Sequence, residues 1–162
     1  METIAFTKVK LPFGWMSNMS PHPITVGDLT WRTAEALFQA CRFAFNDPIR
    51  LEIHSQTSPM AAKMVAKKEV ARMVVVPQSS DDLGLMELVL RLKLQAHPNL
   101  AEELKATGKA LIIEDCSKRP HGSGLFWGAE KVTNEDGTIW WRGSNNLGHL
   151  WDKLRTELQG QP

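Results

Sequence analysis

The longest regular pattern of apolar residues in this sequence lies between Asp81 and Leu94. Two aspartates come first, as is common in the first turn of a helix, and leucine, methionine and valine then recur every three or four residues. This spacing predicts a long amphipathic helix with a broad apolar face. Such a face needs other elements to cover it. With 162 residues, 43% of them hydrophobic, the chain is long enough to form one domain with a buried core.

Shorter helices are predicted on both sides of this segment. Thr33 is a suitable N-cap for a helix whose core-facing residues are expected to be Ala34, Leu37, Phe38, Cys41 and Phe45. Ser58-Pro59 is an N-cap followed by a first-turn proline, and opens a helix that runs through Lys67. Further helices are expected over Pro98–Thr107, ended by Gly108, and over the C-terminal segment with Leu147, Leu150, Trp151, Leu154 and Leu158 on one stripe.

Strand patterns are few and short. They cover Ile4–Val9, the pair Pro23–Val26 and Leu29–Trp31 joined at Gly27-Asp28, a buried Ala110–Ile113 and Thr138–Trp141. No repeat or linker divides the chain. We therefore expect a compact, helix-dominated α+β fold with a small β-sheet, formed by residues 1–162 as a single domain.

Charge and cysteine content limit the partners. The formal net charge is +1, so any contact with a polyanion must be local. Cys41 and Cys116 lie far apart without CxxC spacing and the histidines are scattered, so neither a metal site nor a cofactor is expected. No segment approaches the roughly 20 apolar residues that a transmembrane helix needs. A reducing, cytoplasmic setting without membrane contact is the simplest expectation.

The candidate chemistry begins at Glu35, two residues after the expected cap. Gln39 and Arg42 follow one and two turns later, so an amide and a guanidinium line up with the carboxylate. This row either binds a polar ligand or is a helix-stabilising stripe with an acidic first turn. Asn18 likewise either binds a ligand or bonds its own backbone in a turn.

Other candidates lie later in the chain. Glycines bracket Trp127, which suits either stacking of a flat ligand or core packing. The Gly143–Gly148 segment enters the last helix with backbone N–H groups suited to a phosphate, without P-loop spacing. A basic run, interrupted only by Glu69, is formed by Lys63, Lys67, Lys68 and Arg72, and it is either a solvated face or an anion contact. Asp115 ends the predicted buried strand as a further carboxylate.

Taken in order, these segments resemble the YbiA-like (NADAR) family. The match is carried by Ser17-Asn18-Met19, Pro23-Ile24, Trp31 through Ala40 with Phe43, Ser58-Pro59-Met60 with Lys63, Leu111 with Glu114, Trp127-Gly128, and Gly143-x-Asn145-x-Leu147-Gly148 before Arg155. The resemblance spans roughly residues 6 to 158. It implies an α+β N-glycosidase that cleaves the bond between a ribose anomeric carbon and an exocyclic amine.

The family resemblance also assigns roles. Glu35 matches its functional glutamate, which can stabilise an oxocarbenium-like carbon, activate water or protonate the amine. Lys63 matches a basic position and is a candidate Schiff-base nucleophile, and Asp115 is a further catalytic candidate. The expected substrate-binding residues are Asn18, Arg42 and Asn145 for ribose hydroxyls or phosphates, Trp127 for the base or sugar, and Trp15, Gln39, Gly128 and Gly143 beside them.

The chain departs from the family pattern at three places. Ala36 replaces a histidine, Pro77-Gln78 replaces a tryptophan, and Ala129 replaces an acidic residue for which Glu130 or Asp115 is a substitute. These departures argue against a riboflavin-intermediate substrate. They leave a role on guanine-linked ADP-ribose open, and the expected substrate is ADP-ribose on guanine, in nucleic acid or nucleotide. The alternatives are hydrolysis of a ribosylamino-pyrimidine phosphate of riboflavin biosynthesis and a non-catalytic module that binds ADP-ribose.

Overall fold

A computed structural model describes residues 1–161, which form seven α-helices and six short strands. The chain divides into two compact units. Unit 1 comprises residues 1–17 and the chain from 101 onward, and unit 2 comprises residues 18–100. The helix-dominated α+β class predicted from the sequence is confirmed. Its strands form three separate two-stranded sheets among the described residues, and the assignment of residues 1–162 to a single domain stays a prediction.

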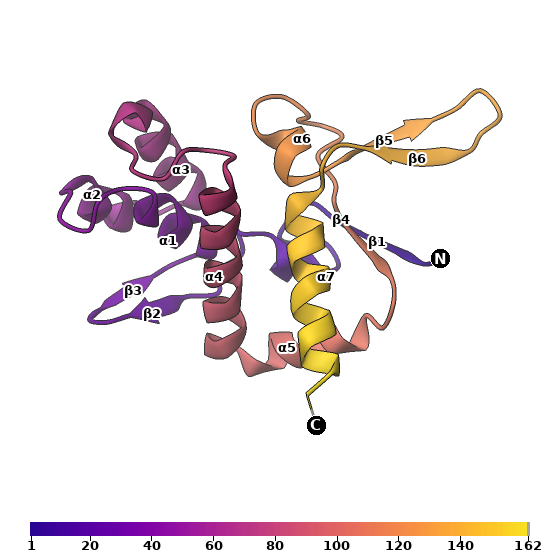
Figure 1. The fold of residues 1–162 in the computed structure, drawn as a ribbon, viewed down its shortest axis with the longest axis horizontal. Coiled ribbons are helices and arrows are strands. Elements are labelled where there is room, and N and C mark those ends of the chain that lie inside the picture. Colours follow the sequence, from indigo (N-terminus) through magenta and orange to yellow (C-terminus); the bar gives the residue numbers. More distant parts are fainter. Residues whose placement is uncertain (162) are drawn as a thin grey trace. The chain divides into compact units, whose positions relative to one another are not determined.

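Unit 2 is built around one short helix. Its elements are β2 (Ile24–Val26), β3 (Leu29–Trp31), α1 (Ala34–Cys41), α2 (Ile49–Ser55), α3 (Pro59–Lys68), the 3₁₀ turn η2 (Val70–Arg72) and α4 (Ser80–Ala96). Helices α2, α3 and α4 all pack against α1 (Figure 1). As a result every residue from 34 to 40 is buried, including the polar ones.

Local signals fixed most of these boundaries. The hairpin pairs Val26 with Leu29 across its turn, and the Thr33 and Ser58 hydroxyls accept hydrogen bonds that cap α1 and α3. The placement of Phe45 in the core was wrong, since its side chain is 91% exposed. Helix α1 ends at Cys41, so the 3.6-residue spacing that placed Phe45 inward no longer applies.

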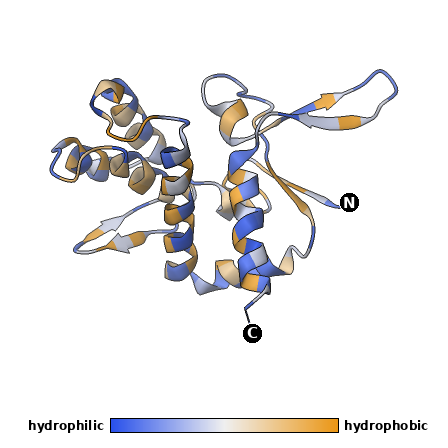
Figure 2. Ribbon diagram, viewed as in Figure 1, coloured by the Kyte–Doolittle hydropathy of each residue, from blue (hydrophilic) through white to orange (hydrophobic). Residues whose placement is uncertain are grey.

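Unit 1 combines strands with the C-terminal helix. Its elements are β1 (Thr3–Phe6), η1 (Gly14–Met16), β4 (Leu111–Glu114), α6 (Gly124–Trp127), β5 (Glu130–Thr133), β6 (Ile139–Arg142) and α7 (Asn146–Gln159). Helix α5 (Pro98–Ala106) contains the junction between the units. Strand β1 runs parallel to β4, and α7 packs against β4. Hydrophobic and hydrophilic residues are interspersed along α7 (Figure 2), and Leu147, Trp151 and Leu154 are among its buried residues.

Two strand predictions need adjustment. The first strand ends at Phe6 rather than at residue 9. Strand β4 is not buried along its whole length, because Leu111 is 37% exposed while Ile112 and Ile113 are buried. None of the helices in residues 1–161 has the length and apolar content required to span a bilayer.

Near its C-terminal end, the buried face of α4 contains a charged residue, Lys93, whose side chain is fully buried. Its Nζ donates to Ser20 Oγ at 2.7 Å, and Ser20 Oγ lies 2.8 Å from His22 Nδ1. The His22 and His97 rings meet edge to face at 5.1 Å. Burial lowers the pKa of Lys93 to about 7, and it also lowers the pKa of His22, with a further contribution from the Lys93 charge.

Stability should therefore rise with pH above neutrality. Between pH 7 and 8.5 the unfolded chain keeps the Lys93 proton that the folded chain has released, so the free energy of unfolding increases by about 1 kcal/mol per pH unit. Urea denaturation at several pH values measures this slope. Lys93→Met should flatten it, whereas Lys67→Met, at an exposed lysine on α3, should leave it unchanged. An equal slope in all three proteins would contradict the assignment.

Candidate active site

Glu35 lies in the first turn of α1 and is only 7% exposed. Two contacts fix this end of the helix. The Thr33 hydroxyl accepts a hydrogen bond from the Ala36 N–H at 3.2 Å. The Glu35 N–H donates to the Asn18 carbonyl at 2.9 Å. The N-terminal end of a helix favours a carboxylate, and the second contact ties the segment that carries Asn18 to Glu35.

The polar row predicted on α1 exists, and it is buried instead of solvated. Gln39 Nε2 donates to Glu35 Oε1 at 2.9 Å, and Arg42 Nη1 donates to Gln39 Oε1 at 3.4 Å. Glu35 Oε2 receives no hydrogen bond from the described residues. A buried carboxylate with one oxygen held and the other available can act on a bound reactant.

Asp82 is the member of this cluster that the sequence did not reveal. Its fully buried carboxylate accepts from Arg42 Nε at 2.9 Å and from Arg42 Nη2 at 2.6 Å. The Gln78 N–H donates to the same carboxylate at 2.8 Å. In the sequence Asp82 was only a first-turn acidic residue of α4, and no local signal indicated a partner forty residues earlier.

Asn18 presents a buried acceptor without a protein partner. Its side chain is 7% exposed, and Nδ2 lies 3.1 Å from the thioether sulfur of Met86. Among residues 1–161 no donor reaches Asn18 Oδ1. A buried amide oxygen without a donor is costly unless something else satisfies it, so this atom is suited to accept a hydrogen bond from a ligand hydroxyl.

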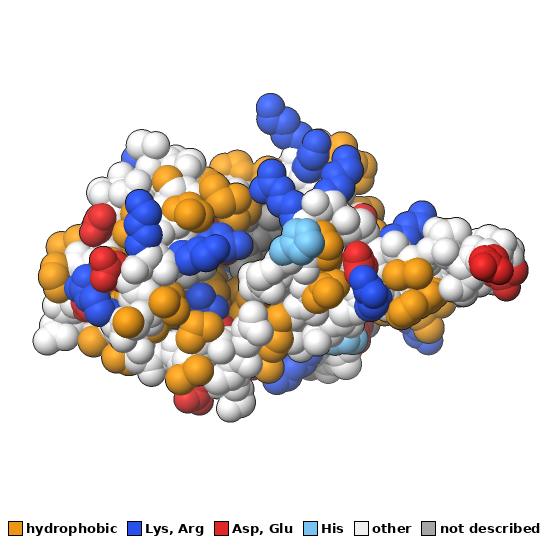
Figure 3. Space-filling model, turned by 90° about the horizontal axis from the view of Figure 1, so that it is seen from above, with side chains coloured by type: hydrophobic (Ala, Val, Ile, Leu, Met, Phe, Trp, Pro, Cys, Tyr) orange, Lys and Arg blue, Asp and Glu red, His pale blue; other side chains and the backbone are white. Residues whose placement is uncertain are grey.

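Lys63 belongs to α3, in a stripe with Met60, Met64 and Lys67 at helical spacing. Lys63 is half-buried, Lys67 is exposed, and each methionine is 44% exposed. The lysines at 63, 67 and 68 have no ion-pair partner among the described residues, whereas Arg72 pairs with Asp47 and Glu69. Figure 3 shows cationic and apolar side chains intermixed on the face seen from above.

Asp115 and Asn145, predicted as site residues in unit 1, make contacts that hold the backbone. Asp115 Oδ1 accepts hydrogen bonds from the Ser117 N–H at 2.9 Å and from the Ser117 hydroxyl. Asn145 Oδ1 accepts from the Glu114 N–H at 3.0 Å, and its Nδ2 donates to the Ile112 carbonyl at 2.8 Å. Asn145 has a φ of 48° and attaches the start of α7 to β4.

The predicted glycines also answer a packing requirement. A Cβ on Gly143, whose φ is +140°, would lie 2.5 Å from the Gly128 carbonyl oxygen. A Cβ on Gly128 would lie 2.4 Å from the Glu114 carbonyl oxygen. Real Cβ atoms do not approach a carbonyl oxygen this closely, so both positions require glycine. The two glycines allow three backbone segments to pack against one another.

The two predicted aromatic residues of unit 1 both pack against other rings. Trp127 in α6 meets the Phe126 ring at 4.8 Å, and Trp15 meets Trp151 at 5.5 Å, each pair edge to face. Trp151 in turn donates from Nε1 to the Met16 carbonyl at 3.0 Å. Both Trp15 and Trp127 keep part of their surface exposed, and their roles in binding stay predictions.

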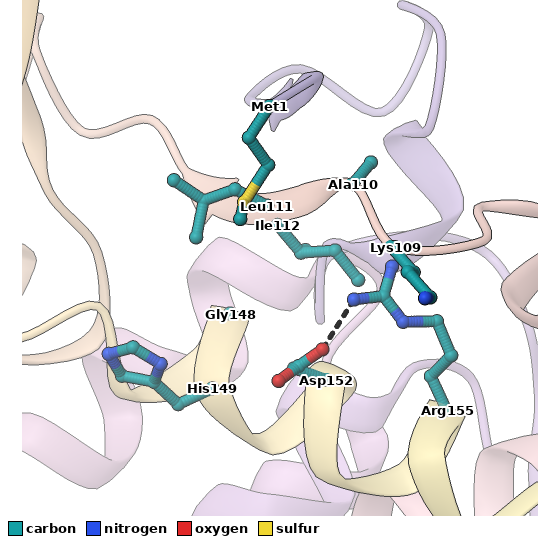
Figure 4. A pocket seen from close by; sticks show the side chains of 9 residues that line it. All are labelled: Met1, Lys109, Ala110, Leu111, Ile112, Gly148, His149, Asp152 and Arg155. Atoms are coloured by element: carbon teal, nitrogen blue, oxygen red, sulfur yellow. Dashed lines mark hydrogen bonds and ion pairs between the residues drawn. The ribbon is translucent and has the colours of Figure 1, made fainter.

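A hollow of about 180 Å³ lies elsewhere in unit 1, beside β4 and α7. Figure 4 shows Lys109, His149, Asp152 and Arg155 among its lining residues, with Asp152 and Arg155 joined as an ion pair. None of the predicted site residues lines it. It is also smaller than the roughly 300 Å³ typical of the smallest ligand pockets.

Comparison with known proteins defines the class. Residues 5–159 match the NADAR domain family, and the chain belongs to this family. It is 30% identical to "N-glycosidase Npun_R5314" of Nostoc punctiforme over 161 residues, covering 97% of this chain and 93% of that protein. It is also 30% identical to "N-glycosidase YbiA" of Escherichia coli K12 over 155 residues, covering 96% and 88%.

A solved structure agrees with these matches. The NMR structure of the E. coli protein YbiA superimposes with a TM-score of 0.75 at 29% identity, covering 98% of this chain and 85% of that chain. The family resemblance and the N-glycosidase class predicted from the sequence are therefore confirmed.

The role of Asn145 in holding β4 is testable by stability. Asn145→Ala removes two buried hydrogen bonds and puts alanine, which tolerates positive φ less well than asparagine, at this position, so the free energy of unfolding should fall by about 2 kcal/mol. Asn145→Gly removes the same hydrogen bonds and tolerates the backbone conformation, so its loss should be smaller. Urea denaturation measures both, and a loss below about 0.5 kcal/mol in both variants would rule out this role.

Proposed function

We propose that this N-glycosidase hydrolyses the bond between the ribose of ADP-ribose and the exocyclic amine of guanine. The observation that supports it best is the buried Glu35 carboxylate, held at Oε1 by Gln39 and available at Oε2. Asn18 Oδ1, joined to the same helix end through the Asn18 backbone, supplies an acceptor for a sugar hydroxyl.

The chemistry follows from the carboxylate. As the carbon–nitrogen bond lengthens, the anomeric carbon becomes oxocarbenium-like, and a carboxylate stabilises that positive charge. Glu35 takes a proton from the attacking water and returns a proton to the departing amine. The water oxygen becomes the anomeric hydroxyl, and guanine leaves with its amino group restored.

A second route through Lys63 uses the same overall reaction. Its Nζ attacks C1 of the ring-opened sugar, the guanine amine leaves, and water hydrolyses the resulting imine. Borohydride added during turnover distinguishes the routes, because it reduces an imine to a stable adduct on Lys63 and leaves direct hydrolysis without an adduct.

The choice of an ADP-ribosyl substrate has two supports. The lysines of α3 lack acidic partners and suit the diphosphate or a nucleic-acid backbone. Ala36, Pro77-Gln78 and Ala129 depart from the pattern of many family members, which argues against the riboflavin intermediate and leaves guanine-linked ADP-ribose open. Hydrolysis of a ribosylamino-pyrimidine phosphate remains the alternative reaction.

Glu35→Gln should abolish turnover while retaining binding. Loss of the acid–base group should reduce release of ADP-ribose from a guanine-ADP-ribosylated oligonucleotide at least about 100-fold. Affinity for free ADP-ribose should change little, because the amide keeps the shape of the carboxylate. Glu52→Gln, at an exposed glutamate of α2, is the matched control and should keep full activity.

The same assay decides between the candidate functions. Release of the pyrimidine product alone, from a parallel incubation with the ribosylamino-pyrimidine phosphate, would replace the proposed substrate. An inactive parent chain that still binds ADP-ribose would show a binding module. Full activity of Glu35→Gln would show that the Glu35 carboxylate takes no part in the reaction.

The lysines of α3, unpaired among the described residues, predict that substrate binding depends on salt concentration. Lys67→Gln and Lys68→Gln should each raise KM for the oligonucleotide and reduce the slope of log KM against log salt concentration by about 0.7 to 0.9. Lys109→Gln, at an exposed lysine of unit 1, should change neither quantity. Equal slopes in all four proteins would exclude α3 from nucleic-acid contact.

A further inference from the structure

The Arg42–Asp82 ion pair is costly to bury, and its position calls for an explanation. Asp82 is fully buried and the Arg42 side chain is 10% exposed. Desolvation of two charges often outweighs their attraction, so an apolar pair of similar volume is frequently as stable or more stable. A contribution to folding stability therefore does not explain well why a buried guanidinium and carboxylate occupy these positions.

The pair determines which way the Gln39 amide faces. Arginine carries only donors, and Asp82 holds the guanidinium through Nε and Nη2, leaving Nη1 directed at Gln39. Gln39 must therefore turn its oxygen toward Arg42. Its Nε2 then faces Glu35, where it donates to Oε1.

The backbone of Arg42 reinforces this arrangement. Its carbonyl accepts hydrogen bonds from the N–H groups of Val74 at 2.9 Å and Val75 at 3.2 Å. The Arg42 guanidinium also lies over the Phe38 ring at 4.3 Å, so its side chain is held by an aromatic face as well as by Asp82. The position of Arg42 is thus fixed from several directions.

We propose that Asp82 is a positioning residue for the reaction, acting through Arg42 and Gln39 to hold the Glu35 carboxylate with Oε2 facing the sugar. This inference rests on the proposed function of Glu35. It assigns Arg42 and Gln39 to the support of Glu35, in place of the direct substrate contact expected from the sequence.

The decisive variant removes both charges together. Asp82→Asn alone leaves a buried guanidinium without its ion pair. A fall in activity could then come either from destabilised folding or from a misoriented Gln39 amide. Arg42→Met combined with Asp82→Leu replaces the pair by apolar groups and should keep the thermal midpoint close to that of the parent. Its kcat should still fall about 10- to 100-fold with KM within about threefold, because Gln39 is no longer oriented.

A double-mutant cycle tests whether the Arg42–Asp82 pair acts on Glu35 through Gln39. In a Gln39→Met background, adding the Arg42→Met, Asp82→Leu pair should lower kcat by less than about twofold, because the intermediate amide is already absent. Asp47→Asn, which breaks the exposed Arg72 ion pair in the same unit, is the matched control and should leave kcat unchanged. If the Arg42→Met, Asp82→Leu variant kept both the kcat and the thermal midpoint of the parent, the proposal would be overturned.

A measurement without substrate separates this proposal from the catalytic one. In ¹⁵N-labelled protein the Gln39 side-chain N–H resonances should shift in the Arg42→Met, Asp82→Leu variant and stay in place in Asp47→Asn. Unchanged resonances would overturn the relay whatever the activity. Shifted resonances with an active Glu35→Gln protein would keep the relay and reject the role of Glu35 in the reaction.

Discussion

The contact between Arg42 and Asp82 joins the end of α1 to the first turn of α4, and the site in unit 2 depends on it. The guanidinium is engaged by Asp82, and the Arg42 carbonyl is engaged by the backbone before α4. A two-point contact between planar groups fixes direction as well as distance. The orientation of α1 side chains one and two turns earlier, Gln39 and Glu35, follows from that direction.

Sequence reasoning succeeded where structure depends on neighbours within about four residues. Thr33 and Ser58 were recognised as caps because a cap bonds the third residue after it. The missed features have distant partners or weak local signals. Asp82 and Lys93 have hydrogen-bond partners 40 and 73 positions away in the sequence, and α2 begins after Pro48 without a side-chain cap.

The residues carried over from the family resemblance differ in what they do. In unit 2, Glu35 and Asn18 each keep a polar atom that the described residues do not occupy. In unit 1, glycine is required at 128 and 143 because backbone segments approach closely there, and both polar atoms of the Asn145 amide form hydrogen bonds with the backbone of β4. A family pattern therefore records folding requirements alongside chemistry, and only the hydrogen-bond partners of each side chain separate the two.

Because alanine follows Glu35, the Glu35 carboxylate has no neighbouring imidazole to share proton transfer. Without an imidazole at position 36, the proposed reaction has to move its protons through Glu35 itself. Gln39 donates to Oε1 through an amide that does not titrate, so this contact holds the oxygen without competing for a proton. Proton transfer is then confined to Oε2, and a fixed Oε1 becomes the condition for a defined reaction geometry. The buried ion pair behind Gln39 supplies that condition.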